Sequence, residues 1–388
     1  MKILIVTPAL AFLYGGTTKI VLELADALSK LGADVDVVAT NANGSSRLDY
    51  PVNKWIIENN YRIMYFDYFD LFDYKFTFSL TMWLYRNITK YDLVHTHAIF
   101  SYPVLPAYWA CQINKIPYVV TPHGMLEPWA LAYKSNKKKL YFSLLEKPAI
   151  QKAAIIHLIA SVEAENVKNL NLGSPLVVIP NGIHRADFES LPSPEIFYEQ
   201  FPDTRNKTLI IFLGRIDPKK GLDLLATAFG KVHELFPETH LIVAGQDNIG
   251  FLPTAKGYFQ AAGCNEAVTF TGMLSGDLKY SALAAARIYV APSYSEGFSM
   301  SVLEGMASGL PCVITTGCNF PEADQVSCIV DIDVQGITQA LIGLLQNPLE
   351  AKKMGDRARE FVLENYTWDK VAEKMVSLYS QILNKTIE

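Results

Sequence analysis

The 388-residue chain is half hydrophobic and only 19% charged, and its formal net charge at pH 7 is −5. This composition excludes long disordered stretches, and the acidic balance argues against nucleic-acid binding. The length exceeds what one ordinary hydrophobic core contains, so we expect two domains. The five cysteines include no C-x-x-C pair, which argues against a disulfide framework or zinc site and fits a reducing, cytoplasmic compartment.

The first residues, MKILIVTPALAFL, predict a buried strand rather than a signal peptide, because Pro8 interrupts the apolar run. No apolar run approaches the roughly 20 residues that span a bilayer. A locally basic stretch contains Lys134, Lys137, Lys138 and Lys139. It is either a solvated helix face or a contact with anionic lipid or a phosphate-bearing acceptor. The second alternative predicts peripheral association with the inner face of the cytoplasmic membrane.

The first half of the chain alternates strands with helical stretches. A continuously apolar strand is expected at residues 3–7, a helix at 20–31 and a strand at 35–39. Further strands are expected at residues 93–95, 118–121, 155–158 and 177–179. This pattern predicts a doubly wound α/β domain. The aromatic-rich stretch 61–85 is assigned to buried packing, with an acceptor-facing surface as the alternative.

The second half repeats the pattern after a proline-containing stretch, 190–206, that we interpret as a linker. Strands are expected at residues 209–213, 241–244, 268–270, 288–291 and 312–315. A helical segment follows from residue 368 to about 383. We therefore predict a Rossmann-like acceptor domain at 1–195, a Rossmann-like donor domain at 196–365 and a C-terminal helix within 366–388.

Ligands of open α/β sheets bind outside the carboxyl ends of the strands, so we expect the functional residues in the loops that follow the strands. The first strand of the second domain ends in the loop from Gly214 to Gly221, which contains Arg215 and Lys220. Two fixed cations at a strand end suit a diphosphate leaving group, which gains negative charge as its bond breaks. The alternative is a surface loop with ordinary charges.

The loop after residue 290 of the second domain adds to this pattern. It contains Glu296 and Gly297, and a helix is expected to follow from about Ser301 to residue 309. The glycine permits close backbone approach, and the helix start offers free N–H groups to phosphate oxygens. Glu296 and Glu304 are then placed to accept hydrogen bonds from hydroxyls of the hexose and the ribose, respectively. The alternative assigns Glu296 to helix capping and Glu304 to a solvated face.

In the first domain, Gly15 and Gly16 follow the first strand, where a backbone must pass close to a ligand. The three spaced glycines of a dinucleotide fingerprint are absent, which disfavours an NAD site. His123 directly follows a strand, and it either meets the reacting sugar or has a structural role. His97, at the preceding strand end, is a candidate acceptor contact. No histidine cluster has metal-ligand spacing, so neither a metal nor another cofactor is expected.

With these residues in hand, the whole chain resembles the retaining glycosyltransferases of family 4, which have the GT-B architecture. The resemblance rests on Glu296 and Glu304 separated by seven residues, the GRxDxxKG-like stretch 214–221, the Pro-His-Gly element 122–124 and the glycine pair at 15–16. The stretch 319–322 is similar to that of bacterial members that make surface polysaccharides. The resemblance implies two Rossmann-like domains facing each other across a cleft, with the C-terminal helix crossing back to the first domain.

The resemblance also implies roles for individual residues. Arg215 and Lys220 would bind the donor diphosphate, and Glu304 would hold the ribose. His123 would bind the donor sugar near its reacting carbon. The remaining donor contacts would be Gly15, Gly16, Met273, Glu296, Gly297, Phe298, Ser299 and Met300. Many relatives have Gly or Pro where this chain has Ser299, which places sugar selection there in question.

The sequence therefore predicts retaining, metal-independent transfer of a hexosyl group from a nucleotide sugar, with UDP-glucose ahead of GDP-mannose and other UDP-hexoses. The acceptor would be a glycan or lipid-linked saccharide of cell-envelope or exopolysaccharide biosynthesis. Three alternatives remain open: a glycan phosphorylase, a nucleotide-sugar epimerase of GT-B type, and a non-catalytic sugar-nucleotide-binding protein.

Overall fold

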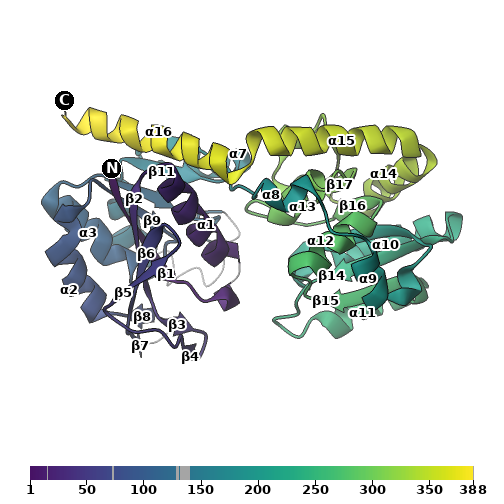
Figure 1. Cartoon of the computed structure of the whole chain (residues 1–388), viewed down its shortest axis with the longest axis horizontal. Coiled ribbons are helices and arrows are strands. Elements are labelled where there is room, and N and C mark those ends of the chain that lie inside the picture. The colour runs from purple at the N-terminus through teal and green to yellow at the C-terminus, as the bar shows by residue number, and fades with distance from the viewer. Residues whose placement is uncertain (15, 72–73, 128–130, 132–139, 388) are drawn as a thin grey trace. The chain divides into compact units, whose positions relative to one another are not determined.

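The computed structural model describes residues 1–14, 16–71, 74–127, 131 and 140–387. The chain forms two compact units (Figure 1). Unit 1 consists of Met1–Asn181 with Trp368–Glu388, and unit 2 of Gly182–Thr367. No helix among the described residues has both the length and the apolar character needed to cross a bilayer.

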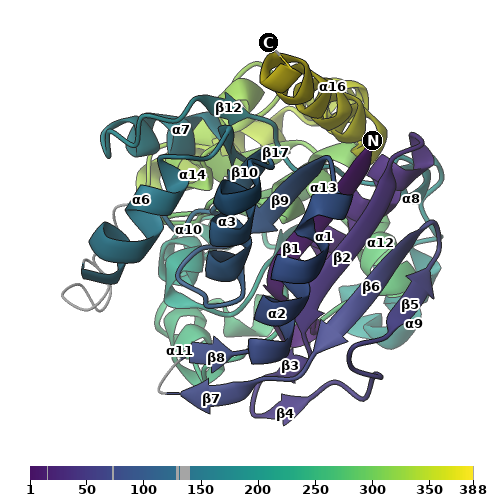
Figure 2. The ribbon, with the colours of Figure 1, turned by 90° about the vertical axis from the view of Figure 1, so that its left-hand side faces the viewer.

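Unit 1 contains an eight-stranded sheet in the order β12-β11-β10-β9-β1-β2-β6-β5, within the described part of the chain. Neighbouring strands are parallel except β5, which runs antiparallel to β6. Figure 2 shows β1, β2, β6 and β9 side by side. The strands are β1 Lys2–Ala9, β2 Asp34–Thr40, β5 Trp55–Glu58, β6 Tyr61–Phe66, β9 Leu93–His97, β10 Tyr118–Thr121, β11 Ile155–Leu158 and β12 Leu176–Val178. Two short antiparallel pairs accompany this sheet: β3 Ala42–Asn43 with β4 Ser46–Arg47, and β7 Phe69–Leu71 with β8 Tyr74–Phe76.

Helices cover both faces of this sheet because successive side chains of a strand point to opposite faces. Leu4 and Val6 of β1 pack in one cluster with α2 and α3, whereas Ile3 and Ile5 pack in another with α1 and α16. Figure 1 shows α2 and α3 on the side of the sheet opposite to α1. The helices are α1 Gly16–Lys30, α2 Phe78–Asn87, α3 Val104–Asn114, α6 Lys147–Ile150, α7 Ser161–Lys168 and α16 Trp368–Ile387.

The C-terminal helix α16 belongs to unit 1 although 186 residues of unit 2 precede it in the chain. It packs along α1, and Val371, Met375 and Tyr379 are buried in the same cluster as Ile3 and Ile5. Nε1 of Trp368 donates a hydrogen bond to Glu23 of α1 over 2.7 Å. The predicted helical segment at residues 368–383 therefore completes the apolar cover of the first sheet.

Unit 2 contains a six-stranded parallel sheet in the order β15-β14-β13-β16-β17-β18, within the described residues. The strands are β13 Thr208–Leu213, β14 Thr239–Ala244, β15 Val268–Gly272, β16 Ile288–Ala291, β17 Cys312–Thr315 and β18 Cys328–Val330. The helices are α8 Ala186–Glu189, α9 Glu195–Gln200, α10 Leu222–Leu235, α11 Leu252–Ala261, α12 Gly276–Ala285, α13 Met300–Ala307, α14 Val334–Gln346 and α15 Pro348–Asn365.

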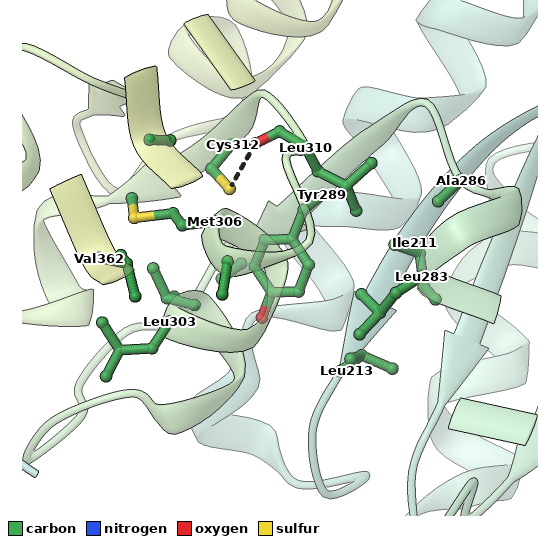
Figure 3. Packing of buried hydrophobic residues seen from close by; sticks show 14 of the residues in the cluster. Ile211, Leu213, Leu283, Ala286, Tyr289, Leu303, Met306, Leu310, Cys312 and Val362 are labelled. Atoms are coloured by element: carbon green, nitrogen blue, oxygen red, sulfur yellow. Dashed lines mark hydrogen bonds between the residues drawn. The ribbon is translucent and has the colours of Figure 1, made fainter. Parts of the chain in front are cut away.

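Alternate residues of β13 again enter different clusters. Ile211 and Leu213 pack with α12, α13 and α15, and Ile210 and Phe212 pack with α10, α11 and α14. Figure 3 shows the first cluster, in which the ring of Tyr289 lies beside α13. Each sheet is therefore buried on both faces, as continuously apolar parallel strands require.

The eleven strands that the sequence predicts are all present, with ends shifted by at most a few residues. Three more strands complete the sheets. β5 and β6 form a hairpin around Asn59 and Asn60, which places much of the predicted packing stretch 61–85 in or beside the sheet. β18 adds an edge strand to unit 2.

The boundary between the units differs from the predicted one at 195/196. The chain passes from unit 1 to unit 2 between Asn181 and Gly182. Phe188 and Phe197, in the stretch before the second sheet, are buried in the core of unit 2, and the backbone N–H of Phe197 donates to Oγ of Ser281. Residues 182–201 are therefore packed structure rather than a linker, because their aromatic side chains are buried against unit 2.

Candidate functional site

In unit 2, the carboxyl ends of the parallel strands meet at one edge of the sheet, and the loops that follow β13 and β16 pack together there. The backbone N–H of Tyr294 donates to the carbonyl of Lys219 over 2.8 Å. Gly221 has φ +67, and a Cβ at this position would stand 2.0 Å from the carbonyl oxygen of Pro292. Only glycine permits this approach, so the loop of the two predicted cations is fixed against the loop of Glu296.

Two further glycines, which the sequence analysis did not select, hold the same edge together. A Cβ at Gly245 would stand 1.7 Å from the carbonyl oxygen of Gly214, and one at Gly317 would stand 2.3 Å from that of Ser293. The carbonyl of Gly317 accepts a hydrogen bond from the N–H of Glu296 over 2.8 Å. The loops after β13, β14, β16 and β17 therefore form one rigid surface.

Glu296 and Lys220 are brought into direct contact on this surface. Nζ of Lys220 forms a short ion pair with Oε1 of Glu296, and each side chain is 14% exposed. Oγ of Ser293 donates to the same carboxylate oxygen over 2.7 Å, and the amide of Asn319 donates to the backbone carbonyl of Glu296. The carboxylate is thus turned toward the cation loop and does not cap α13.

The other predicted cation, Arg215, is exposed at the end of β13. Lys219 lies in the same loop, and burial lowers the pKa of its amine. Asp217 lies in the same loop and Glu296 pairs with Lys220, so Arg215, Lys219 and Lys220 leave a net positive charge at this edge of the sheet. Such a charge suits a bound diphosphate.

The second predicted carboxylate, Glu304, lies on α13 and is 13% exposed. It forms an ion pair over 2.9 Å with Lys279 of α12, which the sequence analysis did not identify. Gly305 lets α13 lie against Tyr289, because a Cβ there would stand 2.6 Å from the ring. The hydroxyl of Tyr289 donates to Ser301 over 2.9 Å, which fixes the first turn of α13.

The remaining unit 2 residues from the sequence analysis surround the start of α13 or follow β15. Ser299 is the N-cap residue and its side chain caps no N–H group. The N–H of Val302 donates to the carbonyl of Ser299, so the N–H groups of Met300 and Ser301 are the ones that α13 offers to a ligand. The ring of Phe298 packs against Phe320 and Tyr366, and both Phe298 and Gly297 are half-buried. Met300 is half-buried, and Met273 follows β15 and is 68% exposed.

In unit 1, Gly16 begins α1 and is exposed. Apart from its chain neighbours and the backbone of α1 itself, no atom of the described residues lies within 4 Å of where its Cβ would stand. Packing within unit 1 therefore does not explain this glycine, whereas close approach of a ligand would. Its neighbour Gly15 lies outside the described residues, as do Lys134, Lys137, Lys138 and Lys139.

His123 follows β10 and has φ +52, a left-handed conformation that is uncommon for a residue other than glycine. Its Nε2 lies 2.9 Å from Nδ1 of His97, which is buried at the end of β9. Burial lowers the pKa of His123 to about 3, with His157 as the second cause. The N–H of Gly124 donates to the buried carboxylate of Glu163 over 2.7 Å and holds the loop in this conformation.

A chain of buried hydrogen bonds runs beneath the His123 loop. Nε2 of His157 must donate to the carbonyl of Ile179, since a carbonyl only accepts. Its Nδ1 then accepts from the hydroxyl of Thr121, which in turn accepts from Nε2 of His95. The hydroxyl of Tyr379 on α16 donates to Nδ1 of His95 over 2.7 Å. Both imidazoles are therefore neutral, and burial lowers the pKa of each.

The roles of Glu163, His157, Thr121 and Tyr379 could not be predicted from the sequence, because their hydrogen-bond partners lie far away along the chain. The same reason applies to Lys279 and the two packing glycines in unit 2. Among the described residues, no group of three or more His, Cys, Asp or Glu side chains is placed to hold a metal ion.

Two family models divide this chain between them. The model described as "Glycosyltransferase Family 4" matches residues 14–187, and that described as "Glycosyl transferases group 1" matches residues 195–361. A phosphatidyl-myo-inositol mannosyltransferase from Mycolicibacterium smegmatis is 27% identical over 396 aligned positions, which cover 98% of this chain and 94% of that protein.

Solved structures share the fold. A sucrose-phosphate synthase from Thermosynechococcus elongatus superposes with a TM-score of 0.77 at 19% identity, covering 99% of this chain and 100% of that one. HepE from Anabaena, solved in complex with UDP and glucose, gives a TM-score of 0.76 at 16% identity, with coverages of 98% and 100%. The chain therefore has the GT-B fold, is a glycosyltransferase and belongs to glycosyltransferase family 4.

Proposed function

We propose that this glycosyltransferase transfers a hexosyl group, with retention, from a nucleoside diphosphate sugar to a glycan or lipid-linked saccharide. UDP-glucose is the proposed donor, and cell-envelope or exopolysaccharide biosynthesis in the cytoplasm, at or near the inner face of the membrane, is the proposed setting. One observation carries the proposal. Lys220 and Arg215 lie at the edge of the unit 2 sheet where Glu296 is held, and Glu304 lies on the helix that starts there.

The ion pairs of this edge suggest how the donor is received. Lys220 neutralises Glu296, and Lys279 neutralises Glu304. A diphosphate would attract Lys220, and the carboxylate of Glu296 would then accept hydrogen bonds from hydroxyls of the transferred sugar. Glu304 would accept from the ribose in the same way. Two cations and the first N–H groups of α13 would stabilise the departing diphosphate without a metal ion.

Retention is proposed to occur on one face of the sugar. The bond between C1 and the phosphate oxygen breaks, a bond from C1 to the acceptor oxygen forms, and the acceptor hydroxyl proton passes to the departing phosphate. The environment of Glu163, whose carboxylate contacts the His123 loop, supports this choice over a covalent enzyme intermediate. Both its oxygens accept backbone N–H groups, from Gly124 and Ile159, so it is not positioned as a nucleophile.

The proposal is tested by a thermal-shift screen of nucleotide sugars, followed by hydrolysis and transfer assays with and without EDTA. We expect UDP-glucose to raise the melting temperature most and EDTA to leave turnover unchanged. Strict dependence of turnover on Mg²⁺ would contradict the metal-independent scheme. An inverted anomeric product would contradict retention.

A mannosyl donor is the second candidate. It is favoured by the relatives at 27–28% identity, which are phosphatidyl-myo-inositol mannosyltransferases. A larger thermal shift and faster hydrolysis with GDP-mannose than with UDP-glucose would select it. Product analysis separates both candidates from an epimerase, which converts the donor without an acceptor, and from a binding protein, which forms no product.

A further inference from the structure

A cavity of about 310 Å³ opens at the carboxyl edge of the unit 1 sheet, and the described residues that line it all belong to unit 1. Its walls come from the end of β1, the segments after β1, β9 and β10, the start of α1, and β8. Its main side chains are those of Tyr14, Thr17, Tyr74, Lys75, Phe100 and Met125. The volume lies at the low end of the range of ligand sites, roughly 300–1,000 Å³, and suits one sugar ring better than an extended glycan.

The position of the cavity in the fold is the one where α/β sheets bind ligands. The chain leaves β1 for β2 on one side, and β9 later pairs with β1 on the other side. The strand order reverses at this point, and a crevice forms outside the carboxyl ends of the two strands. Ala98 and Phe100, both in the wall, have φ values of +70 and +57. Left-handed backbone at residues other than glycine is typical of ligand sites.

Aromatic rings supply much of the wall and are held rigidly. Tyr74 stacks on Tyr141 with ring centroids 5.3 Å apart, and Phe100 contacts the same ring at 6.1 Å. Aromatic faces carry partial negative charge and attract the slightly positive C–H groups of a sugar ring. The hydroxyls of Thr17 and Ser101 add hydrogen-bonding groups.

The electrostatics of the cavity select the charge of its ligand. Lys75 is the only charged residue among the described residues that line it. The first turn of α1 contains no acidic residue, so its N–H groups add further positive potential. A neutral sugar is usually held by carboxylates that accept from its hydroxyls, and no described lining residue supplies one.

Lys75 can exchange its ion-pair partner Asp70 for an anionic ligand. Its Nζ lies 3.0 Å from Asp70, and the two side chains are 28% and 62% exposed. Exposed ion pairs contribute little to stability, so an anionic ligand can replace Asp70 at low cost.

We propose that this cavity binds the acceptor sugar and that this sugar carries an anionic substituent, a carboxylate or a phosphate, held by Lys75 and the start of α1. The inference rests on the proposed function, since it names the class of acceptor that receives the hexosyl group. A carboxylate would come from a hexuronic acid, and a phosphate from a phosphorylated or lipid-linked sugar.

Direct binding tests the inference with three probes, methyl glucuronide, glucose 6-phosphate and methyl glucoside, measured by calorimetry in the presence of UDP. We expect at least one anionic probe to bind about tenfold or more tightly than the neutral probe, as the net strength of a charge-assisted hydrogen bond implies. The preferred anionic probe identifies the substituent. Lys75→Ala should abolish the preference, and Lys75→Glu should exclude both anionic probes.

Lys90→Ala is the matched control. Lys90 is an exposed lysine of unit 1 that donates to Asn87 just before β9, at the opposite edge of the sheet. The Lys90→Ala variant should keep the wild-type preference for an anionic probe. Equal affinity for all three probes, no binding of either anionic probe, or an unchanged preference in Lys75→Ala would each overturn the inference.

Donor hydrolysis without acceptor, measured in the same preparations, separates this inference from the proposed function. The control variant Lys90→Ala should hydrolyse the donor at the wild-type rate. A wild-type protein that hydrolyses no nucleotide sugar contradicts the proposed function. A protein that hydrolyses donor but shows no anionic preference contradicts the acceptor inference alone.

Discussion

Replacement of Lys220 by alanine separates two roles that the structure gives this side chain. Lys220 is the ion-pair partner of Glu296, and it is the proposed contact of the donor diphosphate. Loss of the first role lowers the free energy of unfolding. Loss of the second lowers turnover in protein that is fully folded.

The two magnitudes follow from the surroundings of the pair. Glu296 is 14% exposed and keeps the hydrogen bond from Ser293 when the lysine is removed. We expect the free energy of unfolding to fall by about 1–3 kcal/mol, the cost of a partly satisfied carboxylate. Removal of a group that stabilises charge in the transition state lowers kcat by about 10²–10³. The double variant Lys220→Ala, Glu296→Ala should recover part of the lost stability and none of the activity.

Urea unfolding and donor turnover, measured on the same samples, test this reasoning. Arg205→Ala is the control, because the pair of Arg205 with Glu195 is exposed and far less is expected from its loss, under about 1 kcal/mol. A folded Lys220→Ala protein with near-normal kcat would refute the donor-site role. No stability gain in the double variant would refute the coupling between Lys220 and Glu296.

Two further predictions concern the buried chain of unit 1. Tyr379→Phe leaves Nδ1 of His95 buried without a hydrogen-bond donor, so the free energy of unfolding should fall by about 1–3 kcal/mol. A urea titration measures this change. An unchanged unfolding midpoint would contradict the hydrogen-bond assignment. Burial lowers the pKa of His157 to about 4, below the value near 6.5 of an unfolded chain. Between these values the unfolded chain binds a proton that the folded protein does not, so this residue makes stability rise with pH from about 4 to 6.5. His157→Gln should flatten that rise, and an identical pH profile would count against a neutral, buried imidazole.

Much of the fold could be predicted because its strands are short apolar runs separated by amphipathic helices. β10, β11, β16 and β17 have the predicted ends. Proline or a polar residue bounds the runs of β10, β16 and β17 on both sides. The hairpin of β5 and β6 was missed although a signal was present. The two residues between its strands are Asn59 and Asn60, and Asn59 has φ +46, as a tight hairpin turn requires. The aromatic content of the segment hid the alternation of a strand.

The unit boundary shows how composition misleads when side chains decide the outcome. Prolines and polar residues between positions 190 and 206 suggest an exposed connection. Phe197 is nevertheless fully buried, and Ser281 accepts the N–H group at the same residue. Contacts with residues more than 80 positions away fixed this segment, and no local pattern reports them.

The sequence by itself determined which loops meet at the edge of each sheet, because parallel strands place all their carboxyl ends together. That is why Arg215, Lys220, Glu296 and Glu304 could be selected from their positions after β13 and β16. Only the tertiary structure decided their partners. Lys279 reaches Glu304 across two packed helices, and Glu163 holds the loop of His123 from 39 residues away. Ion pairs and the protonation states of buried side chains depend on interatomic distances and on the exclusion of water. Packing between segments that are remote in the chain sets these distances and excludes the water.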